Sequence, residues 1–221
     1  MGKRGTKPQG KVKLEWSPEF AYAIGLLTTG GNLSPDGRYI VFTSKDKELI
    51  DNFQKSLQID LHVGRKASGS HKPKKYYVVQ IGDVRFYGFL LGIGLTPRKT
   101  KTIGVVAVPR RYFFDFLRGH FDGDGSSYSY WDPRWRSSFM FYTSFLSASK
   151  KHIDWLRSVI ADRAGVSGHI TKSVKGSVYQ LKYAKKESLK LFPMMYYNTR
   201  VICLSRKRLK MEKAFAVKDK H

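Results

Sequence analysis

The apolar positions of this sequence follow two periods, one helical and one strand-like. Recurrence at helical spacing predicts helices over residues 18–29, 46–57, 86–95, 110–122, 151–164 and 189–197. Ser17 can cap the first of these helices through its side chain, and Pro18 suits the first helical position. The pattern therefore predicts several helices that each bury an apolar face.

β-Branched and aromatic residues mark the expected strands. They predict strands over residues 38–44, 76–81, 103–108, 138–145, 168–171 and 177–182. Residues 62–75 are polar and basic and are expected to form the long turn of a hairpin. Residues 126–136 are predicted to be a turn rich in aromatics, and residues 200–213 a basic tail segment. Residues 1–14 lack periodicity, which predicts a basic flexible arm.

The two halves of the chain repeat the same order of elements. Ile50-Asp51-Asn52-Phe53 aligns with Ile153-Asp154-Trp155-Leu156, and Arg98-Lys99 aligns with Arg206-Lys207. The predicted fold class is α+β, with two pseudo-symmetric αββαββα halves over residues 15–106 and 107–221. Two halves with corresponding parts imply a pseudo-two-fold axis, along which the first helices of the two halves are expected to pack.

A short motif stands at the start of each half. The second copy is LRGHFDGDG over residues 117–125, and the first is AIGLLTTGG over residues 23–31. Gly119 and Gly123 are four residues apart, so on a helix they share one face and allow a close helix contact. Asp124 is expected at the bottom of that contact. An ordinary helix that ends in an acidic loop is the alternative, and the second copy favours the motif.

The net charge of the chain indicates what kind of molecule it binds. The 221 residues contain 41 Lys+Arg against 17 Asp+Glu, a formal net charge of +24, which favours a polyanion and most often a nucleic acid. A membrane surface is the rival, but no apolar run reaches the roughly 18 residues of a spanning helix. The start of the chain lacks the apolar stretch of a secretory signal, so an intracellular protein is expected. The single Cys203 excludes an intramolecular disulfide and a thiolate cluster.

The two motifs resemble those of the LAGLIDADG homing endonucleases in their single-chain form. The second copy matches the family motif at its glycines and both aspartates, whereas the first keeps the glycine and the apolar positions but has no acid. The resemblance implies two curved antiparallel sheets that form a DNA-binding saddle. It also implies a monomeric, site-specific double-stranded DNA endonuclease that requires no protein partner and no membrane.

The resemblance also implies the chemistry of the site. In the family the last acid of each motif binds metal, and this position is Asp124 in the second copy and Gly30 in the first. The implied cofactor is Mg²⁺ or Mn²⁺, with Ca²⁺ as an ion that occupies the site without cleavage. The predicted metal positions are Asp124, Gly31 and Gly123, and the predicted catalytic positions are Asp124, Gly30, Lys99 and Lys207. Lys101 is a near alternative, and a solvated or phosphate-tracking lysine is the alternative for each.

The missing acid at Gly30 leaves the function open among three hypotheses. The first is an endonuclease whose present form is a nickase or an inactive variant. The second is a non-cutting RNA maturase that assists intron splicing, and the third is a general basic nucleic-acid protein. His120 stands where the family has an apolar residue, and we expect it to pack at the helix face.

Base-reading and phosphate-contacting side chains are expected to alternate along the strands and to occupy the basic loops. The predicted DNA-binding residues are Arg38, Ser44, Arg65, Lys66, Lys72, Lys74, Gln80, Arg85, Arg134, Arg136, Lys172, Lys175, Gln180 and Lys182. Individually each is equally consistent with an ordinary surface residue. Tyr128, Tyr130, Trp131 and Trp135 suggest base stacking, with an aromatic loop that covers the sheet as the alternative.

Overall fold

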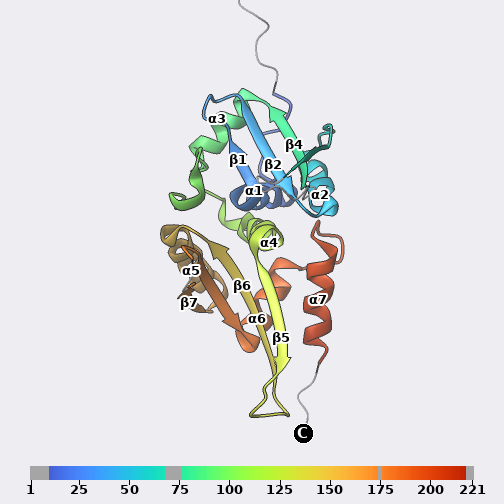
Figure 1. Ribbon diagram of the computed structural model, residues 1–221, viewed down its shortest axis with the longest axis vertical. Helices are drawn as coiled ribbons and strands as arrows, with labels where there is room; N and C mark the ends of the chain where they lie inside the picture. Colours follow the sequence, from blue (N-terminus) through green and yellow to red (C-terminus); the bar gives the residue numbers. More distant parts are fainter. Residues whose placement is uncertain (1–9, 68–75, 174–175, 218–221) are drawn as a thin grey trace, which may run out of the picture.

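The computed structural model describes residues 10–67, 76–173 and 176–217 (Figure 1). The first half contains α1 (Pro18–Gly30), β1 (Gly31–Leu33), β2 (Tyr39–Ser44), α2 (Lys47–Leu57), β3 (Gly64–Lys66), β4 (Tyr76–Gly82), α3 (Val84–Gly92) and the 3₁₀ turn η1 (Lys99–Lys101). The second half contains η2 (Arg110–Tyr112), α4 (Phe113–Asp124), β5 (Ser126–Trp131), β6 (Phe139–Ser147), α5 (Lys150–Ala164), β7 (His169–Lys172), β8 (Tyr179–Ala184), α6 (Lys185–Met195) and α7 (Ser205–Phe215).

Each half has one four-stranded antiparallel sheet with the same strand order. The orders are β1-β2-β4-β3 and β5-β6-β8-β7, and each pair of neighbouring strands is antiparallel. The matching orders confirm the predicted α+β class and the two pseudo-symmetric halves. Among the described residues no helix is both long enough and apolar enough to cross a bilayer.

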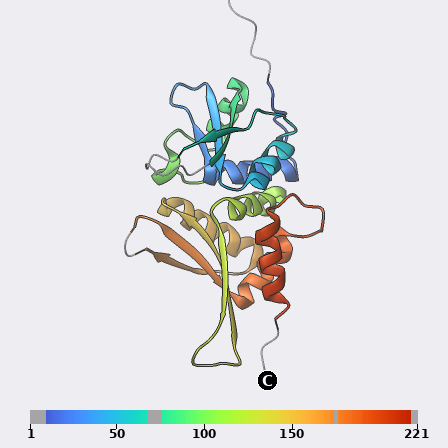
Figure 2. The same ribbon diagram turned by 45° about the vertical axis from the view of Figure 1, so that its right-hand side comes forward.

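Helices α1 and α4 lie side by side between the two sheets, as Figures 1 and 2 both show. Helix α1 begins where predicted, because the Ser17 side chain accepts a 3.1 Å hydrogen bond from the backbone N–H of Phe20. Every residue from Phe20 to Thr28 is buried. A helix that is apolar on all sides fits only an interior position, which α1 takes between α4 and its own sheet.

The crossing of α1 and α4 depends on two glycines. A Cβ atom added at Gly25 would lie 2.2 Å from the carbonyl oxygen of Phe116, and one added at Gly119 would lie 2.1 Å from that of Tyr22. Both distances are far inside van der Waals contact, so the two backbones touch only because these residues have no side chain. The close helix contact predicted from the motif is confirmed.

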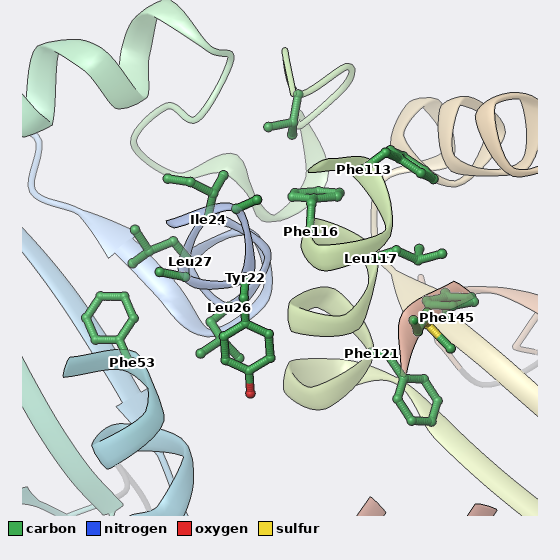
Figure 3. Close-up of a cluster of buried hydrophobic side chains, with 14 of the residues drawn as sticks. Tyr22, Ile24, Leu26, Leu27, Phe53, Phe113, Phe116, Leu117, Phe121 and Phe145 are labelled. Atoms are coloured by element: carbon green, nitrogen blue, oxygen red, sulfur yellow. The ribbon is translucent and has the colours of Figure 1, made fainter. Parts of the chain in front are cut away.

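Leu117 and Phe121 of α4 point into the second half and Leu27 of α1 points into the first, whereas Tyr22 lies between the two helices (Figure 3). In the second half, the rings of Phe121 and Phe145 lie 5.9 Å apart, centroid to centroid. In the first half, Phe42 of β2 and Phe53 of α2 lie 4.6 Å apart under α1. Burying one such side chain contributes about 1.5–3 kcal/mol. The protein therefore has a core in each half and a joint of small residues between them.

The sequence prediction was wrong for four segments, one of which is the turn predicted over residues 62–75, where Gly64–Lys66 form strand β3 against β4. Residues 103–108 form no strand; Ile103 and Val106 are buried singly in an irregular connection, in which the Ala107 N–H donates to the carbonyl oxygen of Ile93. Residues 126–131 form strand β5 instead of a turn, because alternate side chains there reach the two faces of the sheet. Much of the predicted tail is helix α7, which buries Met211 and Ala214.

The end of the predicted arm is attached to the first half. The backbone N–H groups of Lys11 and Val12 donate to the carboxylate of Asp83, at 2.6 and 3.1 Å. Val12 is buried against the core. Residues 1–9 lie outside the described part of the chain.

Candidate functional site

The two motif helices end next to each other, at Gly30 in α1 and Asp124 in α4. Both residues line a cavity of about 260 Å³ together with Thr43, Asp46 and Tyr76. Asp124 also lines a second, smaller cavity of about 60 Å³ on the side of Lys99. The Asp124 side chain is open to solvent, so it is accessible from both cavities.

Lys99 and Lys207 occupy equivalent positions beneath the two helix ends. The Lys99 ammonium donates to the carbonyl oxygen of Gly31, the residue after α1. The Lys207 ammonium donates at 2.6 Å to the carbonyl oxygen of Gly125, the residue after α4. Helix C-termini carry partial negative charge, which favours a cation at each place. The sequence alignment that paired these lysines therefore matches their placement in space.

Burial opposes charge at these positions. It lowers the pKa of Lys99 to about 8, and the Asp124 carboxylate partly counters this effect. Burial likewise lowers the pKa of Lys207 to about 8, countered first by Asp122 and more weakly by Asp124. Partial desolvation at the helix junction raises the pKa of the Asp124 carboxyl, while the charges of Lys207 and then Lys99 lower it. The ammonium groups of Lys99 and Lys207 therefore both interact electrostatically with the Asp124 carboxylate.

The two lysines differ in how they are bonded. Lys207 also donates to the carbonyl oxygens of Phe121 and Asp122, at 2.6 and 2.8 Å, so all three of its N–H donors are taken. In the described part of the chain Lys99 makes one such hydrogen bond. Lys207 therefore caps α4, whereas Lys99 keeps donors for a ligand. Lys101, the alternative, lies exposed at the end of η1.

The Gly30 side of the larger cavity is filled by an aromatic ring. A Cβ atom at Gly30 would lie 2.9 Å from Cε2 of Phe42 and 3.2 Å from the carbonyl oxygen of Thr43. Asp46 lines this cavity, but Arg206 binds both of its carboxylate oxygens, at 2.6 and 3.2 Å, and this pairing lowers the pKa of Asp46. Of the two carboxylates that line the cavity, Asp124 is the one without such an ion pair.

The donor set fits a hard cation only in part. Among the described residues no group of three or more His, Cys, Asp or Glu side chains is placed to hold a metal ion. Of the predicted metal positions, Gly31 has its carbonyl oxygen engaged by Lys99, and Gly123 packs against the Thr29 side chain. Asp124 thus supplies one oxygen-ligand side chain. A Mg²⁺-like ion commonly binds one or two carboxylates and completes its shell with water and phosphate.

Asp122 is a second important acid, whose role the sequence analysis missed. Its carboxylate accepts hydrogen bonds from the Tyr22 hydroxyl at 2.8 Å and the Leu204 N–H at 2.6 Å. The Tyr196 hydroxyl lies 3.4 Å away. Burial raises the pKa of Asp122 to about 6. A spacing of two residues places Asp122 and Asp124 on different sides of α4, and this was the signal that their roles differ.

The outer sheet faces hold part of the predicted DNA-binding set. Strand register places Gln80 and Lys66 on the face opposite the buried Phe42 and Val79. In the second sheet, Gln180 and Lys182 lie on the face opposite the buried Leu181 and Tyr183. These four side chains therefore share the solvent side of the two sheets.

Other predicted DNA-binding residues lie elsewhere. Ser44, Arg65 and Lys172 fall in the opposite register, and Ser44 instead accepts a hydrogen bond from the Asp46 N–H. Arg85 lies in the first turn of α3, beside Gly10. Arg38, Arg134 and Arg136 lie in strand connections. Lys72, Lys74 and Lys175 lie outside the described residues.

Three tyrosines form a cluster on the outer face of the second sheet. The rings of Tyr128 and Tyr142 stack at 5.0 Å, and Tyr130 lies nearly parallel to Tyr128 at 6.4 Å. The Lys182 ammonium lies 5.5 Å from the ring centroid of Tyr128 and 5.1 Å from that of Tyr142. Trp131 belongs to the other face, where it packs on Phe139. Tyr128 and Tyr130 of this cluster lie on β5, in the segment predicted to be a turn, and Tyr142 lies on β6.

Comparison with known proteins finds similarity in structure but none in sequence. The sequence matches no family model, and no curated protein matches it. Its structure resembles the homing endonuclease I-WcaI, with a TM-score of 0.60 at 12% identity over 94% of this chain and 95% of that one. A mesophilic variant of I-DmoI matches with a TM-score of 0.57 at 13% identity, over 89% of this chain and 97% of that one. The protein has the LAGLIDADG fold.

The LAGLIDADG fold is also found in a protein of another kind. The N-terminal LAGLIDADG domain of DUF199/WhiA matches with a TM-score of 0.54 at 17% identity, over 90% of this chain and 88% of that one. The chain spans 64% of the length of full-length DUF199/WhiA from Thermatoga maritima, with a TM-score of 0.56 at 14% identity over 94% of this chain. The fold is shared with both kinds of protein, so function has to be argued from the site.

Proposed function

We propose that this protein is a site-specific double-stranded DNA endonuclease that cuts one strand. The observation that carries the proposal is the Asp124 carboxylate, which is accessible at the junction of the two motif helices with Lys99 beside it. I-WcaI, which has a similar fold, was solved bound to its DNA recognition sequence, and I-DmoI was solved with DNA and Mg or Mn. These neighbours support a divalent cation as cofactor.

The chemistry requires few groups from the protein. A hard cation, when bound, withdraws charge from the scissile phosphate. Asp124 would hold that ion, and the remaining donors of Lys99 would stabilise the charge that develops on the phosphate oxygens. Asp122 fixes the end of α4 through Tyr22 and Leu204, and so holds Asp124 in place.

The end of α1, at Gly30, is the reason why we expect only one strand to be cut. Gly30 offers no ligand, and Phe42 occupies the adjacent space. Lys207, the counterpart of Lys99 in the second half, has its three N–H donors on carbonyl oxygens. One site therefore retains the groups for hydrolysis, Asp124 from the second half and Lys99 from the first, and the protein acts as a nickase.

Recognition would use the outer faces of both sheets. Gln80 and Lys66 from one half and Gln180 and Lys182 from the other would lie against two half-sites of one duplex. The two halves, residues 15–106 and 107–221, supply one half-site reader each, so a monomer suffices. Because its substrate would be DNA, we place the protein inside the cell.

The test is cleavage of a target selected from a random duplex library by binding in EDTA. Supercoiled plasmid that carries this target is incubated with the wild-type protein and with Asp124→Asn, in Mg²⁺ and in EDTA. The proposal predicts open circles for the wild type in Mg²⁺ only, and none for the variant. Because Asp124 is exposed at a helix end, the variant should still bind the target in EDTA. Open circles from Asp124→Asn at the wild-type rate would refute the assigned role.

The second candidate is a non-cutting binding protein, such as an RNA maturase that assists intron splicing. The absence of an acid at Gly30 and the tyrosine cluster of Tyr128, Tyr130 and Tyr142 favour it, since aromatic rings contact unpaired bases. It predicts tighter binding to an intron RNA than to any duplex DNA, equally in Mg²⁺ and EDTA, with intact plasmid throughout.

A further inference from the structure

Two histidines are buried against each other beside Asp124. His120 of α4 and His152 of α5 are each 1% exposed, and their rings stack at 5.2 Å with an interplanar angle of 21°. The Nδ1 atom of His120 and the Nε2 atom of His152 have no hydrogen-bonding partner among the described protein groups. Leaving a buried polar atom unpartnered costs about 1–3 kcal/mol, so two together call for an explanation.

The first half shows that this place does not require histidine. Gly119 corresponds to Gly25, which pairs His120 with Leu26, and Ile153 corresponds to Ile50, which pairs His152 with Leu49. Both leucines are buried, at 0% and 4% exposed. An apolar pair therefore fits the equivalent position of the fold, and the second half carries imidazoles in its place.

A hydrogen bond to the backbone determines the tautomer of the His152 ring. Its Nδ1 atom lies 2.7 Å from the carbonyl oxygen of Gly104, and because a carbonyl only accepts, Nδ1 carries the proton. Burial lowers the pKa of His152 to about 4, so the ring is neutral near pH 7. Its Nε2 atom is therefore a lone-pair acceptor that needs a donor.

Both histidines line the cavity of about 60 Å³ that also borders Asp124 and Lys99. The hydroxyl side chains Thr28 and Thr29 of α1 and Ser147 of β6 line it as well. A water molecule needs only about 10–15 Å³ of such space together with several polar partners. The cavity is therefore roomy and polar enough for water. The cavity on the Gly30 side is also partly polar, but Leu49 lines it where His152 lines this one.

We propose that His120 and His152 build an internal hydration site next to Asp124, in which the Nε2 atom of His152 accepts a hydrogen bond from an ordered water. That water in turn bonds the Lys99 ammonium or the Asp124 carboxylate. His152 is thus a positioning residue for the site that Asp124 and Lys99 form. The catalytic consequence rests on the proposed nuclease function, whereas the hydration site does not.

The first test is a high-resolution crystal structure of the wild-type protein, compared with His152→Asn and His152→Gln. Asparagine can reproduce the hydrogen bond of Nδ1 to Gly104 but does not reach the place of Nε2. Glutamine brings its amide oxygen near the place of Nε2. We expect water within hydrogen-bonding distance of Nε2 in the wild type and of the glutamine oxygen, and displaced in the asparagine variant. A dry cavity around His152 in the wild type would overturn the proposal.

The second test separates positioning from packing. In Mg²⁺, we expect His152→Asn and His152→Leu to lower the nicking kcat by about ten- to a hundredfold with unchanged DNA affinity, and His152→Gln to recover most of it. The leucine variant should melt no lower than the wild type, because Leu49 fits the equivalent place. Nicking by His152→Leu at the wild-type rate would overturn the positioning role. A wild-type protein that does not nick would refute the proposed function, and the crystallographic water would still decide on the hydration site.

Discussion

The hydroxyl of Tyr22 in α1 donates a 2.8 Å hydrogen bond to the carboxylate of Asp122 in α4, and both groups are buried. This bond joins the two halves through their motif helices. The same carboxylate accepts from the Leu204 N–H, three residues before Lys207. Asp122 therefore ties α1, α4 and the start of α7 together at the base of the candidate site.

The buried Asp122 predicts a pH dependence of stability. Its folded pKa of about 6 lies above the ordinary carboxyl pKa of roughly 3.9 in the unfolded chain. The folded state then binds more protons between these values, so stability falls as pH rises from about 4 to 6. Asp122→Asn keeps an acceptor for Tyr22 and has no charge. Between pH 4 and 7 the unfolding free energy of the wild type should drop by about 1–3 kcal/mol more than that of the variant, as measured by urea unfolding. Parallel pH profiles would contradict the assignment.

The helix crossing predicts a large effect of one added methyl group. Gly119→Ala would place a Cβ atom 2.1 Å from the carbonyl oxygen of Tyr22, so α1 and α4 must separate. We expect a loss of about 3 kcal/mol or more in unfolding free energy. The matched control is Gly88→Ala in α3, where no atom lies within 4 Å of the added Cβ. That variant should gain about 0.5–1 kcal/mol. A wild-type urea midpoint for Gly119→Ala would refute the close crossing.

Restoring an acid at Gly30 should require a second change. The added Cβ atom meets Phe42, whose ring is held against Phe53. Gly30→Asp alone should therefore lower the melting temperature by several degrees. Phe42→Leu frees the space, so the double variant should be more stable than the two single effects predict, by about 0.5–3 kcal/mol of coupling. Strict additivity in this double-mutant cycle would show that Phe42 does not block the position.

The outer face of the second sheet predicts a salt-sensitive contact with DNA. Lys182→Ala should weaken binding to the selected duplex and lower the slope of log affinity against log salt by about 1. Lys150→Ala is the control, because Lys150 lies on α5, behind the sheet, and pairs with Asp154 at 2.7 Å. Fluorescence anisotropy at several salt concentrations measures both slopes. Equal slopes for the two variants would place the DNA elsewhere.

The sequence was sufficient for the parts of the fold that local pattern determines. The motif glycines predicted the crossing of α1 and α4, since only small residues allow such contact, and Gly25 and Gly119 provide it. The paired positions of Lys99 and Lys207 followed from alignment of the two halves. Strand β5 was missed because its alternation is inverted: Tyr128 and Tyr130 lie on the outer face, and the small Ser127 is the buried residue.

Other features depend on tertiary contacts that no local pattern reveals. Helix α7 was predicted as a tail because its buried face contains Lys207, which is stabilised there by carbonyl oxygens of α4 and Gly125. The filling of the Gly30 side by Phe42 requires that β2 pass under the end of α1. His120 and His152 are 32 residues apart, and their stacking appears only when α4 and α5 are packed.

The central claim is that both halves bind the target but only one site hydrolyses DNA. Following each strand of the target separately tests this claim most directly. A selected duplex is end-labelled on one strand or on the other, incubated with the wild-type protein in Mg²⁺, and resolved on a denaturing gel. The account predicts one cut in one strand, its loss in Asp124→Asn, and an intact opposite strand. Cuts in both strands at comparable rates would contradict it, because the missing acid at Gly30 would then not prevent the second cut.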